Sequence, residues 1–250
     1  MRRPRVLVEP DYEALSRRAA ALIDQAVREQ PALVLALPTG ATPVGMYAAL
    51  VDLHRRTGTD WSQVTTFNLD EYAGVGPDDP ESYAAYMRRH LFEHVNLHPA
   101  RCHLPDGLAA DPAAEAARYE AAIDAAGGID LAVLGIGTNG HLGFNEPGSA
   151  LTAATHLAEL SESTWRRNFP HLAARAAMEP AVRARYRRAY TMGIGTILQA
   201  RRILLLASGA GKRAILREAL HGPITTQNPA SLLQLHPDVT LVLDREAGAW

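Results

Sequence analysis

Two pairs of residues in the sequence could transfer protons. Asp70 and Glu71 are adjacent and directly follow the apolar run 64–68. Neighbouring carboxylates repel each other, so one of them could act as a general base with a raised pKa if the pair is buried, and a solvated loop is the alternative. His141 and Glu146 lie close together in a glycine-rich stretch. An imidazole beside a carboxylate is a proton-transfer pair, and a solvated surface histidine is the alternative there.

A third group of residues could bind an anion. The stretch 37–43, Leu-Pro-Thr-Gly-Ala-Thr-Pro, joins an apolar run to a predicted helix. Free N–H groups at the start of a helix favour phosphate, and the alternative is an ordinary β-turn in which Thr42 caps the helix and Pro43 takes its first position. The stretch is not a Walker motif, because no lysine follows its glycine at the required spacing. Lys212 follows another apolar run through a glycine-rich turn and could direct a cation toward the same place.

Apolar runs that alternate with amphipathic stretches must position these residues. They predict strands at 5–9, 32–37, 64–68, 131–136, 203–207 and 239–243. Helices are expected at about 11–28, 44–53, 82–94, 112–126, 195–201, 212–220 and 231–235, with Asp11 as the cap of the first. Uniformly apolar strands that alternate with helices are typical of a parallel sheet covered on both faces. The sequence therefore predicts an α/β fold with an open, doubly wound, mostly parallel, Rossmann-like sheet, whose ligand-binding loops follow the carboxyl ends of the strands.

Composition narrows the class of protein. The chain has 250 residues, with 25 Lys and Arg against 27 Asp and Glu, so its formal net charge is −2. This balance argues against a nucleic-acid binder that works by counterion release. The single cysteine, Cys102, excludes a disulfide framework and a multi-cysteine zinc site, and it fits a reduced, cytoplasmic protein. No apolar stretch approaches the ~20 residues that a membrane helix needs, and no signal-peptide pattern follows the basic N-terminus.

The length fits a single domain over residues 1–250. No internal repeat or low-complexity linker marks a boundary within it. The segment 171–188 is rich in alanine and arginine, with Pro180 near its middle. We therefore expect a lid or surface insertion around 150–188.

Six stretches of the sequence form a longer pattern: LPTGATP at 37–43, FNLDEYAG at 67–74, DPESY at 79–83, GIGTNGHLGFNEPG at 135–148, TMGIGT at 191–196 and LQLHP at 233–237. Together they resemble the glucosamine-6-phosphate deaminase family, also called the glucosamine-6-phosphate isomerase family, whose superfamily includes 6-phosphogluconolactonases. The resemblance implies an aldose–ketose isomerisation that expels ammonia from C2 of glucosamine 6-phosphate and gives fructose 6-phosphate. It implies no metal and no organic cofactor.

The resemblance also implies roles for the matching residues. Asp70 matches the aspartate that moves a proton between C2 and C1, and Glu71 is expected to have a structural role. His141, paired with Glu146, matches the group that opens the sugar ring. Asn139 stands where other members carry Asp or Asn, and as a neutral amide it would orient His141. The residues that match the phosphate site are Thr39, Gly40, Ala41, Thr42 and Lys212.

The segment 163–170 departs from the family's pattern. Members usually carry a Thr-Arg pair that serves an effector site, followed by an Asn-x-Arg-Phe-Phe stretch whose arginine holds the substrate phosphate. Here the sequence reads Ser-Thr-Trp-Arg-Arg-Asn-Phe-Pro, so Trp165 takes the place of the effector arginine. Arg167 matches the phosphate arginine if a short deletion precedes it. Trp165 could stack on a sugar or pack in the core.

Three functions stay open at this point. The first is the deaminase that the resemblance implies. The second is an isomerase or epimerase on a related sugar or cyclitol phosphate, which would use the same base without releasing ammonia. The third is a sugar-phosphate-binding protein without turnover, although the presence of Asp70, His141 and Glu146 argues against it. The expected partner is a small-molecule sugar phosphate, and the sequence does not decide between a monomer and a homo-oligomer.

The tryptophan at position 165 predicts that the effector site of allosteric members is absent. We therefore expect the rate to depend hyperbolically on substrate concentration. Initial rates measured with and without N-acetylglucosamine 6-phosphate test this expectation. A sigmoidal curve that this compound makes hyperbolic would contradict it.

Overall fold

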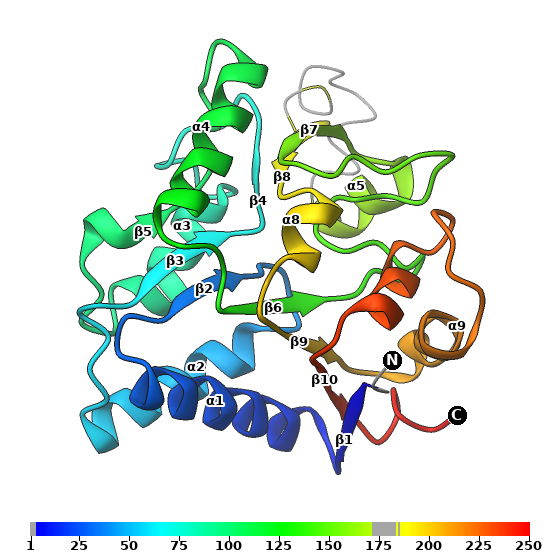
Figure 1. The fold of residues 1–250 in the computed structure, drawn as a ribbon, viewed down its shortest axis with the longest axis horizontal. Helices are drawn as coiled ribbons and strands as arrows, with labels where there is room; N and C mark the ends of the chain where they lie inside the picture. Colours follow the sequence, from blue (N-terminus) through cyan, green and yellow to red (C-terminus); the bar gives the residue numbers. More distant parts are fainter. Residues whose placement is uncertain (1–3, 172–183, 185) are drawn as a thin grey trace.

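The computed structural model describes residues 4–171, 184 and 186–250 (Figure 1). The six strands predicted from apolar runs all form, and they join one parallel sheet together with the short strand β5. The strands are β1 (Arg5–Glu9), β2 (Val34–Leu37), β3 (Thr65–Asn68), β5 (Cys102–His103), β6 (Leu131–Gly135), β9 (Arg202–Ala207) and β10 (Val239–Asp244). Their order is β1-β10-β9-β6-β2-β3-β5, and every pairing is parallel.

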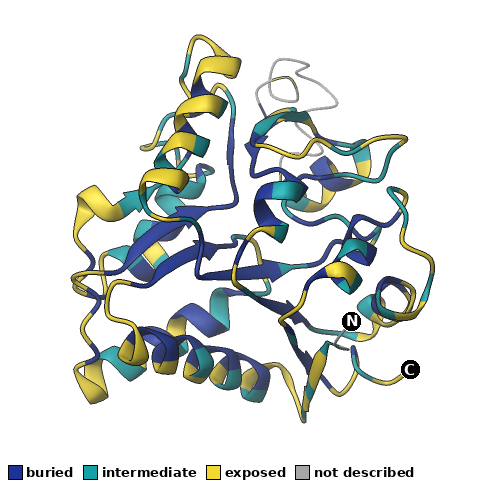
Figure 2. Cartoon of the chain, viewed as in Figure 1, coloured by how far each residue is buried: buried dark blue, intermediate teal, exposed yellow. Residues whose placement is uncertain are grey.

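Both faces of this sheet are buried under helices (Figures 1 and 2). Side chains alternate along a strand, so in β9 Ile203 and Leu205 enter one core cluster while Leu204 and Leu206 enter the other. The first cluster is covered by α4 (Pro112–Ala125), α8 (Ile194–Leu198), α9 (Arg213–His221) and the 3₁₀ helix η4 (Pro229–Leu235). The second is covered by α1 (Tyr12–Glu29), α2 (Val44–Thr57) and η1 (Arg88–Phe92). The doubly wound prediction is confirmed.

The helix starts show which local predictions held. Asp11 caps α1, because its Oδ1 accepts the N–H of Ala14 at 2.7 Å. The alternative in which Thr42 caps α2 is wrong, because Pro43 occupies the cap position and α2 begins at Val44. The hydroxyl of Thr42 therefore lies one residue too early to accept an N–H of the first turn. The 3₁₀ helices η2 (Pro99–Arg101) and η3 (Ala210–Lys212) are short connections.

The predicted helix 82–94 consists of two parts. It begins as α3 (Tyr83–Met87), capped by the hydroxyl of Ser82, which accepts the N–H of Ala85 at 3.0 Å. It continues as η1, which is a π-helix. A π-turn shifts the side chains around the axis and is frequent near functional sites. Here it ends the helix under the second core cluster, where Leu91 is buried.

A second, antiparallel sheet was not predicted. It consists of β4 (Asp70–Tyr72), β8 (Arg188–Thr191) and β7 (His156–Glu159), in the order β4-β8-β7. The helix α5 (Glu162–Asn168) follows β7. Trp165 of α5 is only 2% exposed and packs with Tyr72, Phe144 and other residues of a third core cluster. The core alternative for Trp165 is therefore confirmed.

Part of the expected lid around 150–188 lies outside the described residues, namely 172–183 and 185. The lid and the single domain over 1–250 therefore stay predictions. Among the described residues, no helix combines the length and the apolarity needed to cross a membrane.

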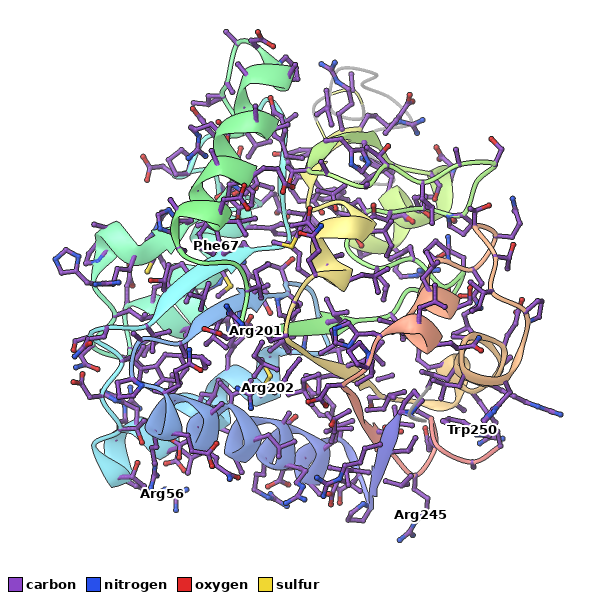
Figure 3. The ribbon with its side chains drawn as sticks, viewed as in Figure 1. Arg56, Phe67, Arg201, Arg202, Arg245 and Trp250 are labelled. Carbon is purple, nitrogen blue, oxygen red and sulfur yellow. The ribbon has the colours of Figure 1, made fainter. Side chains whose placement is uncertain are left out.

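A buried carboxylate holds the amino ends of the central strands, at the edge of the sheet opposite the predicted site. Asp130 accepts the N–H of Val34 at 2.8 Å and a guanidinium N–H of Arg201 at 2.5 Å. Arg201 is labelled in Figure 3, as is Phe67 of β3, which stacks on His103 of β5 at a centroid distance of 4.6 Å. The contacts of Asp130 fix the strands at their amino ends and leave their carboxyl ends to carry the loops.

Candidate active site

The loops that could do chemistry follow four neighbouring strands. In the sheet β9, β6, β2 and β3 lie side by side and point the same way, so their carboxyl ends meet at one edge. The chain winds outward in opposite directions from β2 and β6, and such a switch point is where open α/β sheets bind ligands. A cavity of about 600 Å³ lies there. The predicted site residues that line it are Thr39, Gly40, Ala41, Thr42, Asp70, His141, Arg167 and Lys212.

Asp70 lies at the start of β4, where the chain leaves the large sheet for the small one. The side chain is 6% exposed, and its Oδ1 has no hydrogen-bond partner among the described residues. Burial, and secondarily the charge of Glu71, raises the pKa of Asp70 to about 8, although the hydroxyl of Thr39 acts in the opposite direction. The solvated-loop alternative is wrong for this carboxyl, which has the raised pKa of a candidate general base.

Glu71 points to the other side of β4, as the alternation of a strand requires. Its Oε1 accepts the N–H groups of Tyr72 at 2.8 Å and Tyr83 at 2.9 Å, and its Oε2 accepts that of Ala84 at 2.9 Å. Burial raises the pKa of Glu71 to about 7 even though these three bonds lower it. Glu71 therefore attaches β4 to the start of α3, which agrees with the structural role expected for it.

His141 and Glu146 approach each other in the loop after β6. The Nδ1 atom of His141 lies 3.6 Å from Oε2 of Glu146. Asn139 contacts both residues of this pair: its Nδ2 donates to Oε2 of Glu146 at 2.7 Å, and its Oδ1 accepts the backbone N–H of His141 at 3.3 Å. The role expected for Asn139 in orienting His141 stays a prediction. Burial raises the pKa of Glu146, but His141, the hydroxyl of Thr164 and Asn139 outweigh it and lower this pKa to about 2. Glu146 is thus a stable carboxylate behind the ring.

Close packing against the backbone positions the imidazole. A Cβ atom added at Gly137 would lie 2.4 Å from two ring atoms of His141, so any other residue at position 137 would displace the ring. The N–H of Gly137 also donates to the carbonyl oxygen of His141 at 2.9 Å, and the N–H of Gly140 donates to that of Gly137 at 3.0 Å. This tight turn presents the ring to the cavity.

Tyrosine hydroxyls bind the carbonyl oxygens of the turn 38–42. Tyr47 of α2 donates to the carbonyl oxygen of Pro38 at 2.6 Å, and Tyr86 of α3 donates to that of Gly40 at 2.7 Å. Each bond fixes the orientation of one peptide plane, because an N–H and the preceding C=O point in opposite directions.

A third tyrosine completes this arrangement. Tyr12 donates to the carbonyl oxygen of Thr42 at 2.9 Å and accepts the N–H of Gly45 at 2.9 Å. The backbone N–H groups of residues 39–42 have no acceptor in the described part of the chain, and these residues border the cavity. Gly40 has a φ of +92°, a conformation that favours glycine. The turn is therefore built to offer N–H groups to an anion.

Two cations also line the cavity. The Nζ atom of Lys212, in η3, donates to the carbonyl oxygen of Ile136 at 2.5 Å, and Nη2 of Arg167 donates to Oγ1 of Thr138 at 2.7 Å. Burial, with a further contribution from the charge of Arg167, lowers the pKa of Lys212 to about 8. Across residues 4–171, 184 and 186–250, neither cation forms an ion pair with a carboxylate. An anion bound here would relieve their repulsion.

Sequence reasoning missed several residues that shape the cavity. Tyr72 and Tyr83 line it, with their hydroxyl oxygens 2.8 Å apart, and Asn168 of α5 donates to the hydroxyl of Tyr72 at 3.1 Å. Both tyrosines stand in stretches that carried the resemblance, so the signal was present. Within the described ranges, no group of three His, Cys, Asp or Glu side chains could hold a metal ion.

Comparison with known proteins agrees with this geometry. The model of the family described as glucosamine-6-phosphate isomerases/6-phosphogluconolactonase matches residues 11–242. The chain belongs to this family. A curated glucosamine-6-phosphate deaminase from Halothermothrix orenii is 47% identical over 245 residues, which cover 98% of this chain and 99% of that protein. Another, from Alkaliphilus metalliredigens, is 46% identical over 243 residues, which cover 97% and 98%. The resemblance found in the sequence is confirmed.

Solved structures place the fold in the same family. A structure of a monomeric glucosamine-6-phosphate deaminase is 44% identical, with a TM-score of 0.89 over 98% of this chain and 99% of that chain. A 6-phosphogluconolactonase from Trypanosoma cruzi is 22% identical, with a TM-score of 0.77 over 98% and 96%. The second likeness extends to the fold alone.

The bonds from tyrosine hydroxyls to the turn 38–42 can be tested by mutation. Tyr86→Phe removes the donor to the carbonyl oxygen of Gly40, so the N–H groups of the turn lose part of their orientation. We expect the Kd for inorganic phosphate, measured by calorimetry, to rise about fivefold, the effect of one hydrogen bond of about 1 kcal/mol. Tyr119→Phe is the matched control. It also removes a hydroxyl that donates to a backbone carbonyl oxygen, that of Asn68 at 2.7 Å, but Tyr119 does not line the cavity. Equal losses in both variants would contradict the prediction.

Proposed function

We propose that the chain is an amino-sugar-phosphate deaminase, which converts glucosamine 6-phosphate and water into fructose 6-phosphate and ammonia. The observation that carries the proposal is that Asp70 and His141 line the same cavity as Lys212 and Arg167. A proton-transfer site and an anion site in one sugar-sized cavity fit a sugar phosphate. The names of the relatives support the same substrate.

The phosphate group binds first in this proposal. The N–H groups of the turn 39–42 and the ammonium of Lys212 surround it, and Arg167 offers a guanidinium that can hold two phosphate oxygens. A dianion here also raises the pKa of Lys212 again, because it offsets the charge of Arg167. The sugar carbons then extend from this end toward Asp70 and His141.

Ring opening uses the imidazole. His141 takes the proton of the C1 hydroxyl and returns a proton to the ring oxygen, which breaks the C1–O5 bond and leaves an open-chain aldehyde. Glu146 lies behind Nδ1 and stabilises the charge that the ring carries between these two transfers. Asn139 keeps that carboxylate in place.

Isomerisation uses the buried carboxylate. Asp70 removes the proton from C2 while the aldehyde oxygen takes a proton from the substrate's ammonium group, which gives an enolamine. The protonated Asp70 then returns its proton to C1, which gives an iminium at C2. Water adds to the iminium carbon and ammonia leaves, so the C2 carbonyl of fructose 6-phosphate forms. The substrate's own ammonium group supplies a counter-charge for Asp70, whose Oδ1 has no partner among the described residues.

For assembly and location we propose a monomer in the cytoplasm. The monomeric deaminase structure matches nearly the whole chain at 44% identity, which supports the assembly. A sugar-phosphate substrate and a single cysteine, Cys102, fit a reducing compartment. Sedimentation of the purified chain measures the assembly directly.

The assay that tests the function measures ammonium and ketose together. The wild-type chain should release one ammonium for each fructose 6-phosphate formed from glucosamine 6-phosphate. Asp70→Asn should lower kcat about 10³-fold, because it removes the base, while the Kd for inorganic phosphate stays within twofold. Asp24→Asn is the matched control, since Asp24 is also 6% exposed but belongs to α1 and pairs with Arg28.

Other outcomes of this assay select the other hypotheses. Ketose or epimer formation without ammonium would replace the deaminase by an isomerase or epimerase on a related sugar phosphate. Binding of hexosamine 6-phosphates without any turnover would leave a binding protein.

The shifted groups predict a bell-shaped dependence of kcat/KM on pH. Asp70 must be ionised to act as a base, so activity rises with pH up to its pKa of about 8. Lys212 must be protonated to hold the phosphate, so activity falls as pH rises through its pKa of about 8. Lys212→Arg keeps the positive charge at high pH and should move the falling side upward while the rising side stays. A falling side that does not move in Lys212→Arg would contradict the assignment.

A further inference from the structure

The helix α5 contacts the carboxylate behind His141 near its start and lines the cavity at its end. Near its start, Ser161 and Thr164 reach the carboxylate of Glu146. At its end, Arg167 and Asn168 line the cavity beside the cationic site and Tyr72. One short helix therefore joins the loop that carries the imidazole to the residues around the phosphate end.

The two oxygens of Glu146 have separate sets of partners. Its Oε2 accepts from Asn139 at 2.7 Å and faces Nδ1 of His141 at 3.6 Å. Its Oε1 accepts a short hydrogen bond from the hydroxyl of Thr164 and a second bond from Ser161 at 3.2 Å. Thr164 and Asn139 therefore hold one oxygen each, and together they stop the carboxylate from rotating about its terminal bond.

Thr164 itself has little freedom. It is 2% exposed, and its backbone N–H donates to the hydroxyl of Ser161, the cap of α5, at 3.2 Å. Next to it, Trp165 packs in the third core cluster. A β-branched side chain inside a helix has few allowed rotamers, so the position of the Thr164 hydroxyl depends closely on that of α5.

We infer that Thr164 is a positioning residue for the His141–Glu146 pair, and that through α5 it ties the alignment of this pair to the residues at the phosphate end. The inference rests on the proposed function, because His141 opens the ring there. When Arg167 binds the phosphate, the helix that carries it is held, and with it the hydroxyl on Glu146. The carboxylate then keeps its orientation toward the ring while His141 transfers protons.

The test replaces Thr164 by Val, which keeps the branched shape and removes the hydroxyl. We expect kcat to fall about tenfold, the effect of losing a hydrogen bond to a charged group, with KM and the Kd for inorganic phosphate within twofold of wild type. Thr164→Ser restores the donor and should recover at least half of the lost kcat. Thr196→Val is the matched control. Thr196 is also buried, and its hydroxyl donates to the carboxylate of Glu120 at 2.8 Å, but neither residue lines the cavity.

A second measurement separates positioning from general damage. Substrate deuterated at C2 shows a primary isotope effect on kcat to the extent that proton removal by Asp70 limits the rate. Slower ring opening in Thr164→Val should bring this effect toward one, whereas displacement of Asp70 would raise it. A mere loss of folded enzyme would leave it unchanged.

Four results would overturn the inference. Three concern kcat: a value for Thr164→Val within twofold of wild type, an equal loss in Thr196→Val, or no recovery in Thr164→Ser. The fourth is an isotope effect in Thr164→Val that equals or exceeds the wild-type value. The proposed function fails separately, when the wild-type chain itself releases no ammonium. The wild-type assay therefore comes before the comparison of variants.

Discussion

Burial of the Asp70 carboxyl group, with no cationic partner in the part of the chain that the structure describes, is the constraint on which the rest of the site depends. A carboxyl buried to 6% exposure keeps its proton to about pH 8, so near neutral pH a ligand that brings a positive charge is what favours its ionised, basic form. The fold creates this position by a change of sheet: β3 ends at Asn68, and β4 begins at Asp70 in the small antiparallel sheet. The side chain is thereby placed above the carboxyl ends of the parallel strands.

The cations that line the same cavity are under the corresponding constraint, with the opposite charge. Lys212 and Arg167 have no carboxylate partner among the described residues, and tyrosines occupy the carbonyl oxygens of the turn 38–42. The two cations and the N–H groups of the turn gain a partner once an anion binds. Pre-oriented N–H groups and cations lose little freedom on binding, which favours affinity. The cavity thus combines a neutral acid, Asp70, with a cationic site.

The sequence predicted the large sheet well, because each of its central strands is a run of apolar residues buried on both faces. It did not predict β4, β7 and β8, because strands such as His156–Glu159 mix polar and apolar residues and are held by a neighbouring sheet rather than by their own pattern. The site residues at strand ends were predicted for the same topological reason. Their partners were not: the contact of Asn139 with Glu146, and that of Thr164 with the same carboxylate, depend on loop geometry that spacing does not encode.

The polarity of the cavity also bears on which branch of the family the chain belongs to. Glucosamine 6-phosphate carries an ammonium group at C2 and a phosphate at C6, so it offers one charge that suits the Asp70 carboxyl and one that suits the cations of the site. A phosphogluconolactone carries the phosphate but no ammonium. With such a ligand the carboxyl of Asp70 would stay protonated near neutral pH and could not act as a base. Only an approaching cation lowers its pKa again and makes the ionised form favourable. The buried, unpartnered Oδ1 of Asp70 therefore favours an amino sugar over a lactone on electrostatic grounds, independently of sequence identity.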